Sequence, residues 1–275
     1  MVHAGKELPM ATLTAQEIID RIIQGVGCQP LAQTVDTFKA GDPRAAVTAI
    51  GCTFAATFDV LQRAVGQGIN LLITHEPTFW EHMDNTEAWA GDKLLAAKKQ
   101  FLADHDLVVW RCHDYWHKRR PDGILEGMVR ALGWQSYQRS DGLGFFTLPP
   151  TTLGELAGVI QKKLGAKVVR VTGKAEMPCQ NIAMLPGAHG PVGQIRALQR
   201  EDVDVLVAGE TREWETNEYV RDAVAAGFRK GLILPGHCNS EEAGMEFMAD
   251  WLRQLVPQVR VEFLPAGDPF WSPQV

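Results

Sequence analysis

Short apolar runs alternate with amphipathic stretches along almost the whole chain. The apolar runs predict buried β-strands at 46–53, 71–73, 107–110, 167–171, 181–185, 203–207, 231–234 and 259–264. Helical spacing or helix-forming composition predicts helices at 18–23, 58–65, 91–101, 124–132, 152–164, 192–199, 213–226 and 242–255. Because strands alternate with helices in both halves of the chain, we predict an α/β fold with mostly parallel strands.

The pair Pro149-Pro150 is the best candidate for an internal boundary. Directly after it, Thr152 and Glu155 have the spacing of a capping box, which opens a new helix. We therefore expect an N-terminal α/β domain at residues 1–149 and a C-terminal α/β domain at 150–275. In the first domain the pattern also predicts a loop at 36–43 and a hairpin within 134–148.

Imidazole and carboxylate groups follow the apolar run at 71–73. Thr74, His75 and Glu76 come next, and Pro77 ends the strand. Open α/β sheets place their ligand sites at the carboxyl ends of parallel strands. Neutral imidazole and carboxylate together form a ligand set for divalent metals. The alternative for this pair alone is a polar loop without a ligand.

Two further strand ends carry the same chemistry. His237 and Glu241 lie one helical turn apart across a helix start, where the positive helix end favours a carboxylate. The alternative is that Glu241 only complements the helix dipole. His113 and His117 follow the run at 107–110, and we expect one of them, rather than both, to be a ligand. The other then contacts a ligand or substrate, or packs against Trp116.

Other polar residues are weaker candidates. Glu210 ends the strand at 203–207 and is either a catalytic base, a group that supports a ligand, or an ordinary helix-start residue. His189, in a glycine-rich turn, contacts substrate or has a structural role. The basic run at 118–120 is a solvated surface or an anion site. His82 and His105 are interpreted as surface histidines.

Composition narrows the function classes. With a formal net charge of -6, a uniformly basic nucleic-acid-binding face is not expected. The 5 cysteines are scattered and form no Cys-x-x-Cys pair, so we expect a reducing, cytoplasmic location. The N-terminus has no apolar core of signal-peptide length, and no apolar run approaches the roughly 20 residues of a membrane span, so no membrane association is expected. Metal cations and small polar substrates suit this chain better.

Three strand ends with imidazole and carboxylate supply five donors, more than one tetrahedral zinc requires. Five donors suit two metal ions that share a bridging carboxylate and a bridging water. The same ligand types admit zinc, manganese, iron, cobalt and nickel. The sequence therefore predicts two divalent ions per chain.

The motifs, in this order, resemble the NIF-three-like family of dinuclear-metal proteins, whose members carry the homology-based label GTP cyclohydrolase I type 2. The likeness runs from about Leu13 to Pro265. It rests on Asp36-Thr-Phe-Lys-Ala-Gly-Asp-Pro43, Leu71-Leu-Ile-Thr-His-Glu-Pro77, His113 to His117, Pro186-Gly-Ala-His-Gly190, Ala208-Gly-Glu210 and Gly236-His237-x-x-x-Glu241. The resemblance implies two similar α/β domains with mixed, mostly parallel sheets, a metal site between them, and a homohexamer.

The family's ligands are two adjacent His, an Asp, and a final His and Glu. Carried over, they become His75, Glu76, His117, His237 and Glu241. Glu76 stands where the family has a histidine, and His117 where it has an aspartate. One imidazole and one carboxylate have exchanged places, so the set of three histidines and two carboxylates is preserved. We interpret this exchange as support for a working metal site.

Two functions follow from such a site. The first is a metal-dependent hydrolase, of cyclohydrolase or phosphoesterase type, that acts on a phosphoester or nucleotide-like substrate. The alternative is a non-enzymatic metal carrier, storage or regulatory protein. A purely structural α/β module is a third interpretation, which polar clusters at several strand ends disfavour.

Overall fold

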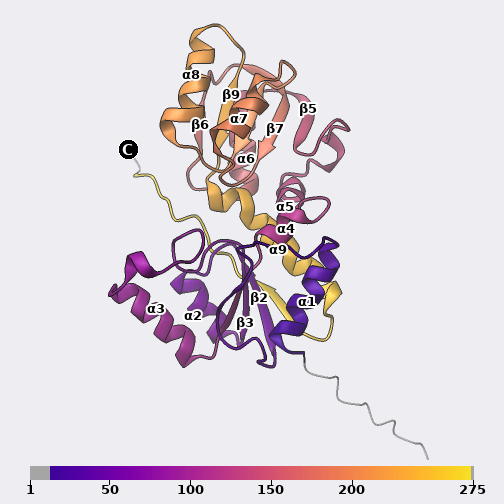
Figure 1. Ribbon diagram of the computed structural model, residues 1–275. Helices are drawn as coiled ribbons and strands as arrows, with labels where there is room; N and C mark the ends of the chain where they lie inside the picture. The colour runs from indigo at the N-terminus through magenta and orange to yellow at the C-terminus, as the bar shows by residue number, and fades with distance from the viewer. Residues whose placement is uncertain (1–12, 274–275) are drawn as a thin grey trace, which may run out of the picture. The chain divides into compact units, whose positions relative to one another are not determined.

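The computed structural model describes residues 13–273, which form two compact units (Figure 1). Within the described residues, unit 1 comprises 13–115 and 249–264, and unit 2 comprises 116–248 and 265–273. Two helices, α4 (Asp114–Lys118) and α9 (His237–Leu255), contain residues of both units. The boundary predicted at Pro149-Pro150 lies within a strand, β5 (Phe145–Thr152), and stays a prediction.

Unit 1 is built on a five-stranded sheet in the order β1-β4-β3-β2-β10. Its strands are β1 (Phe38–Ala40), β2 (Ala49–Thr53), β3 (Leu71–Thr74), β4 (Val108–Arg111) and β10 (Arg260–Phe263). The last four run parallel to one another, and β1 pairs antiparallel with β4 at the edge. Every residue of β2, β3 and β4 is buried, as expected for parallel strands that are covered on both faces.

The register of unit 1 places the ends of three strands side by side. Thr74 of β3 pairs with Thr53 of β2 and with Arg111 of β4. The residues that follow β3 and β4, His75 and Cys112, therefore leave the sheet at the same edge. The helices of this unit are α1 (Ala15–Val26), α2 (Phe58–Gly66) and α3 (Lys93–Asp104), with a short 3₁₀ turn at Glu87–Trp89.

Unit 2 has a second five-stranded sheet, in the order β5-β7-β8-β9-β6. Besides β5, its strands are β6 (Arg170–Thr172), β7 (Pro178–Leu185), β8 (Val205–Ala208) and β9 (Gly231–Leu234). The three central strands are parallel, whereas the edge strands β5 and β6 are antiparallel. Leu185 pairs with Ala208, so the turns after β7 and β8 also lie at one edge.

Alternate residues of β8 face two separate cores in unit 2. Val205 and Val207 pack in the core that includes α5 (Gly123–Leu132) and α6 (Leu153–Leu164). Leu206 and Ala208 pack on the opposite face, in the core that includes α7 (Gly190–Gln199) and α8 (Glu218–Ala225). This alternation follows from the two-residue period of a strand and gives a layer of helices on each face of the sheet.

The predicted α/β fold with mixed, mostly parallel sheets is confirmed. Some local predictions differ from the structure. Residues 36–43 are not only a loop, because β1 lies within them; its three half-buried residues have no apolar run to identify a strand. The hairpin expected within 134–148 is reduced to an isolated bridge between Gln138 and Phe146, since β5 pairs with β7 instead. Among the described residues, no helix has the length and apolar character needed to cross a membrane.

Candidate metal centre

His75 is the first residue after β3, and its side chain is fully buried. Its Nδ1 atom lies 3.1 Å from the carbonyl oxygen of Cys112, the first residue after β4. A carbonyl oxygen can only accept a hydrogen bond, so Nδ1 carries the ring proton and Nε2 keeps a lone pair. His75 is therefore oriented to bind a cation through Nε2.

The start of α4 is held by a carboxylate from a distant part of the chain. Asp36 accepts hydrogen bonds from the backbone N–H groups of His113 at 2.7 Å, Asp114 at 3.0 Å and Tyr115 at 2.8 Å. Burial raises the pKa of Asp36, and the three N–H donors act in the opposite direction. These bonds fix the backbone position from which the His113 side chain starts.

The His113 ring lies against His75. The two ring centroids are 4.6 Å apart and the rings are stacked at 24°. Nδ1 of His113 lies 2.9 Å from a carboxylate oxygen of Asp114, whose other oxygen accepts bonds from the Thr34 hydroxyl and the Val35 N–H. Burial alone would raise the pKa of Asp114, but the bonds from His113 and Thr34 outweigh it and lower the pKa.

His117 lies at the other end of the single turn of α4 and repeats this arrangement. Its Nδ1 atom is 2.8 Å from a carboxylate oxygen of Asp122. The other oxygen of Asp122 accepts bonds from the N–H groups of Ile124 and Leu125, at the start of α5. Burial would raise the pKa of Asp122, but the bond from His117 and the N–H donors lower it.

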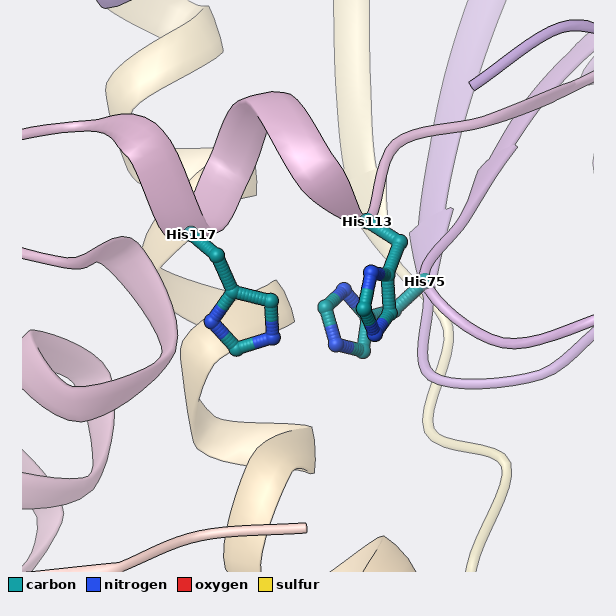
Figure 2. A group of neighbouring side chains, drawn as sticks. All are labelled: His75, His113 and His117. Carbon is teal, nitrogen blue, oxygen red and sulfur yellow. The ribbon is translucent and has the colours of Figure 1, made fainter. Parts of the chain in front are cut away.

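The three imidazoles share one arrangement, in which Nδ1 is within hydrogen-bond distance of a carbonyl or carboxylate oxygen. Figure 2 shows the His75 and His113 rings overlapping, with the His117 ring turned towards them. One nitrogen from each ring can be chosen so that all three lie within 4.8 Å of one another. Histidines that bind metals commonly donate their second ring N–H to an oxygen in this way.

Glu76 adds a carboxylate next to His75. One of its oxygens lies 3.5 Å from the Arg111 guanidinium, and the other lies 4.0 Å from His113 Nε2. Arg111 is fully buried and also donates hydrogen bonds to the carbonyl oxygens of His75, at 3.0 Å, and of His82. Because a buried guanidinium needs a charged partner, Arg111 both holds the loop after β3 and restricts where the Glu76 carboxylate can lie.

In unit 2, the first turn of α9 carries a second histidine–carboxylate pair. His237 Nε2 lies 3.1 Å from an oxygen of Glu241, which is 2% exposed. His237 Nδ1 lies 3.3 Å from a carboxylate oxygen of Glu210, which follows β8. His237 is thus flanked by a carboxylate at each ring nitrogen, as the one-turn spacing of the sequence motif predicts for Glu241.

Gly187 lies so close to His237 and Glu241 that no side chain fits at its position. Its φ is +71°, and a Cβ atom placed there would lie 2.1 Å from Glu241 Oε1 and 3.3 Å from His237 Nε2. Any side chain would therefore displace the Glu241 carboxylate. The glycine-rich turn after β7 permits a close approach to the two donor atoms.

Two further candidates have clear positions. Glu210 has a half-exposed side chain beside His237, which favours a role in orienting that ring. His189 is exposed, precedes α7, and lies with Nδ1 2.7 Å from the carbonyl oxygen of Pro186. This contact closes the turn before the helix, and a contact of His189 with substrate stays a prediction.

The donor set fits a divalent metal ion. Groups of described residues that could hold a metal include His75, His113, His117, Glu76 and Glu241. Imidazole and carboxylate are ligands of zinc and the neighbouring transition metals. The sequence predicted these residue types, but only one of His113 and His117 was expected to be a ligand. The supporting role of Arg111 was missed because its partners are distant in sequence. The supporting roles of Asp114 and Asp122 were missed although both lie within five residues of the histidines that they contact, so their spacing was the available signal.

Comparisons with known proteins identify the family of this chain. A family model described as Duf34/NIF3 (NGG1p interacting factor 3) matches residues 19–269. A Clostridium perfringens protein named GTP cyclohydrolase 1 type 2 homolog is 24% identical over 268 residues, which cover 92% of this chain and 97% of the relative. A Clostridium acetobutylicum protein of the same name is 23% identical over 214 residues, covering 73% of this chain and 75% of the relative.

Solved structures share the fold. The Staphylococcus aureus hypothetical protein SA1388 matches with a TM-score of 0.75 at 18% identity, covering 95% of this chain and all of that one (100%). A Bacillus cereus protein related to NIF3 matches with a TM-score of 0.76 at 16% identity, covering 94% and 99% of the two chains. The family match spans nearly the whole chain, and this protein therefore belongs to the Duf34/NIF3 family.

Proposed function

We propose that this chain binds two divalent metal ions and is a metal-dependent hydrolase of a phosphoester or nucleotide-like substrate. The observation that carries the proposal is the shared arrangement of His75, His113 and His117: Nδ1 of each lies within 3.1 Å of an oxygen atom, and one ring nitrogen from each can be chosen so that the three lie within 4.8 Å of one another. Histidines that bind metals commonly donate their second ring N–H to a carboxylate or carbonyl oxygen in this way.

The proposed ligands are His75, Glu76, His117, His237 and Glu241, which stand at the positions of the family's ligands, with His113 as a sixth donor. His237 and Glu241 belong to unit 2 and lie next to Gly187, where the absence of a side chain leaves the Glu241 carboxylate in its place. Imidazole-rich ligation favours zinc, cobalt, nickel or iron over magnesium and calcium.

When bound, two divalent ions would polarise a substrate oxygen and make a water molecule more acidic. The residues of the chain hold and orient the ligands. Arg111 restricts the Glu76 carboxylate, while Asp114 and Asp122 keep the Nδ1 protons of His113 and His117 in place. Glu210 does the same for His237, so of the roles that the sequence left open for Glu210 we propose ligand orientation over a catalytic base.

The second candidate function is a carrier or storage protein that delivers metal to a partner. The donor set suits this function as well as the enzyme, since six side chains shared by two ions give three ligands per ion and can hold metal with or without turnover. For the enzyme, the names of the two clostridial relatives make a nucleotide the first substrate to test. Self-association as a homohexamer remains part of the proposal on the strength of the family resemblance.

Elemental analysis and turnover assays on zinc-, manganese- and cobalt-loaded protein test the proposal. The expected result is about two ions per chain in the wild type and hydrolysis of one member of a phosphoester and nucleotide panel. His237→Ala should lose metal and activity, whereas His105→Ala, at the end of α3, should lose neither. Metal uptake without turnover, with transfer to an apo-acceptor, would favour the carrier. Failure to retain any of these three metals, and of the nickel and iron that the same ligands admit, would contradict both functions.

A further inference from the structure

Gln194, on α7, is a buried polar residue that the metal site itself does not explain. Its side chain is 1% exposed, and a buried amide is costly unless its polar atoms are paired. Nε2 donates to the carbonyl oxygen of Glu210 at 2.9 Å, and Oε1 accepts from the hydroxyl of Thr216 at 2.6 Å. A carbonyl oxygen only accepts, so this assignment of the two amide atoms is required by the chemistry.

With the bond from Gln194, both the N–H and the C=O group of Glu210 are hydrogen-bonded. The N–H of Glu210 donates to the carbonyl oxygen of Gly187 at 3.0 Å, while its carbonyl oxygen accepts from Gln194. The N–H of Gly187 donates to the hydroxyl of Ser240 at 2.9 Å, and that hydroxyl donates to the carbonyl oxygen of His237 at 2.8 Å. A chain of hydrogen bonds therefore runs from Thr216 to the backbone of His237.

All donors in this chain point in the same direction, from Thr216 towards His237. Bonds arranged head to tail polarise one another in a buried environment. Thr216 and Ser240 are both fully buried, so water does not compete at these two hydroxyls. Loss of the Gln194 side chain would interrupt this series of hydrogen bonds. The Glu210 carbonyl oxygen would lose its bond from Gln194, and the Glu210 peptide group would be held less firmly.

Glu210, whose peptide group these hydrogen bonds hold, also has its side chain beside His237, a proposed ligand. The Glu210 carboxylate is 52% exposed, yet one of its oxygens lies 3.3 Å from His237 Nδ1. A half-exposed glutamate gains little from such a contact unless its backbone is held in place. The chain of hydrogen bonds supplies that constraint.

We propose that Gln194 is a positioning residue of the metal centre, which acts on His237 through Glu210. The inference rests on the proposed function as far as metal affinity is concerned. It also makes a statement about the contact between Glu210 and His237 Nδ1, which can be tested in metal-free protein. The competing explanation is that Gln194 only fills the space between α7 and the segment at 210–217.

The test is a double-mutant cycle with two readouts. Gln194→Met keeps the size of the side chain and removes both bonds, and Glu210→Gln removes the charge beside His237. Gln194→Glu is the second variant: it keeps an acceptor for Thr216 and removes the donor to Glu210. Gln199→Met, at an exposed position of the same helix, is the matched control.

The first readout is zinc affinity from competition with a chelator. Gln194→Met, Gln194→Glu and Glu210→Gln should each weaken binding about 10–100-fold, as loss of an orienting partner does. The pair Gln194→Met with Glu210→Gln should be no weaker than Glu210→Gln alone, because both act on the same ring. Additive losses in the pair, or an unchanged affinity in both Gln194 variants, would overturn the inference.

The second readout is the ¹⁵N chemical shift of His237 Nδ1 in metal-free protein. It should move in the same direction in Gln194→Glu, Gln194→Met and Glu210→Gln, and stay at the wild-type value in Gln199→Met. An unmoved Nδ1 signal in folded Gln194 variants would contradict the inference even if zinc binds. If the wild type binds no metal but the Nδ1 signal moves as expected, the proposed function fails and the positioning role of Gln194 stands.

Discussion

Asp36 and His113 are 77 residues apart in the chain, yet the Asp36 carboxylate accepts the backbone N–H of His113 at 2.7 Å. The same carboxylate accepts the next two N–H groups, of Asp114 and Tyr115. Asp36 thus satisfies three of the N–H groups that a helix start leaves without a helical partner. Through this contact the loop before β1 sets the position of an imidazole after β4.

Replacing Asp36 with Asn should destabilise the protein and weaken metal binding. One oxygen becomes an NH₂ group, which cannot accept from an N–H, so at least one donor at the start of α4 loses its acceptor. We expect a loss of about 1–3 kcal/mol in the free energy of unfolding, measured by urea denaturation. Asp42→Asn, at an exposed position just after β1, should cost less than about 0.5 kcal/mol. Equal stability of the two variants would contradict the role given to Asp36.

Asp122 offers a way to separate capping from metal binding. An asparagine caps a helix about as well as an aspartate, so Asp122→Asn should keep the bonds to Ile124 and Leu125. It removes the charge that holds the Nδ1 proton of His117. We therefore expect near-wild-type stability but zinc affinity lowered about 10–100-fold. Asp122→Ala should lower both stability and zinc affinity. Unchanged zinc affinity in Asp122→Asn would argue against His117 as a ligand that Asp122 supports.

Gly187 and Gly158 should respond to alanine in opposite ways. At Gly187, a Cβ atom would meet Glu241 Oε1 at 2.1 Å, and φ is positive, so alanine should destabilise by about 1–3 kcal/mol and lower metal content. Gly158 lies inside α6 with open space around it, so alanine should stabilise by about 0.5–1 kcal/mol. Thermal unfolding and elemental analysis of both variants check this. Full metal content in Gly187→Ala would show that the Glu241 oxygen is not needed where the structure places it.

Lys98 should give unit 1 a pH dependence at alkaline pH. Burial lowers the pKa of its ammonium group to about 8, and Asp84 partly offsets this effect. Between about pH 8 and the unfolded pKa of about 10.4, the unfolded chain holds a proton that the folded protein has released. The free energy of unfolding should therefore rise with pH in this window, by about 3 kcal/mol at most.

The check compares unfolding free energies of the wild type, Lys98→Met and Lys99→Met at several pH values from 7 to 10.5. The rise should disappear in Lys98→Met. It should persist in Lys99→Met, because Lys99 is exposed and no burial cost applies to its charge. Parallel curves for the wild type and Lys98→Met would contradict the assignment.

The parts of the fold that the sequence predicted well are those set by burial on both faces. The apolar runs of β2, β3 and β4 are entirely buried, so every position carries the signal. β1 has no such run, because its three residues are only half-buried and its place at the sheet edge depends on pairing with β4. Edge strands of this kind are defined by a partner far away in the chain.

The candidate site divides in the same way. His75, Glu76, His237 and Glu241 could be read from strand ends and from the one-turn spacing on a helix start. The supporting groups could not, because their partners are distant in sequence: Asp36 lies 77 residues before His113, and Arg111 lies 36 residues after His75. The Gln194–Glu210 bond likewise joins a helix to a strand end 16 residues later. Only the folded chain brings these groups together.

The central claim is that supported imidazoles bind divalent metal through Nε2. A crystal structure of zinc-loaded protein, with anomalous data collected on both sides of the zinc edge, tests it most directly. We expect two anomalous peaks per chain, one of them within about 2.0–2.1 Å of Nε2 of His75 and of His117. Peaks bound to Nδ1, or peaks only at surface residues away from these histidines, would contradict it.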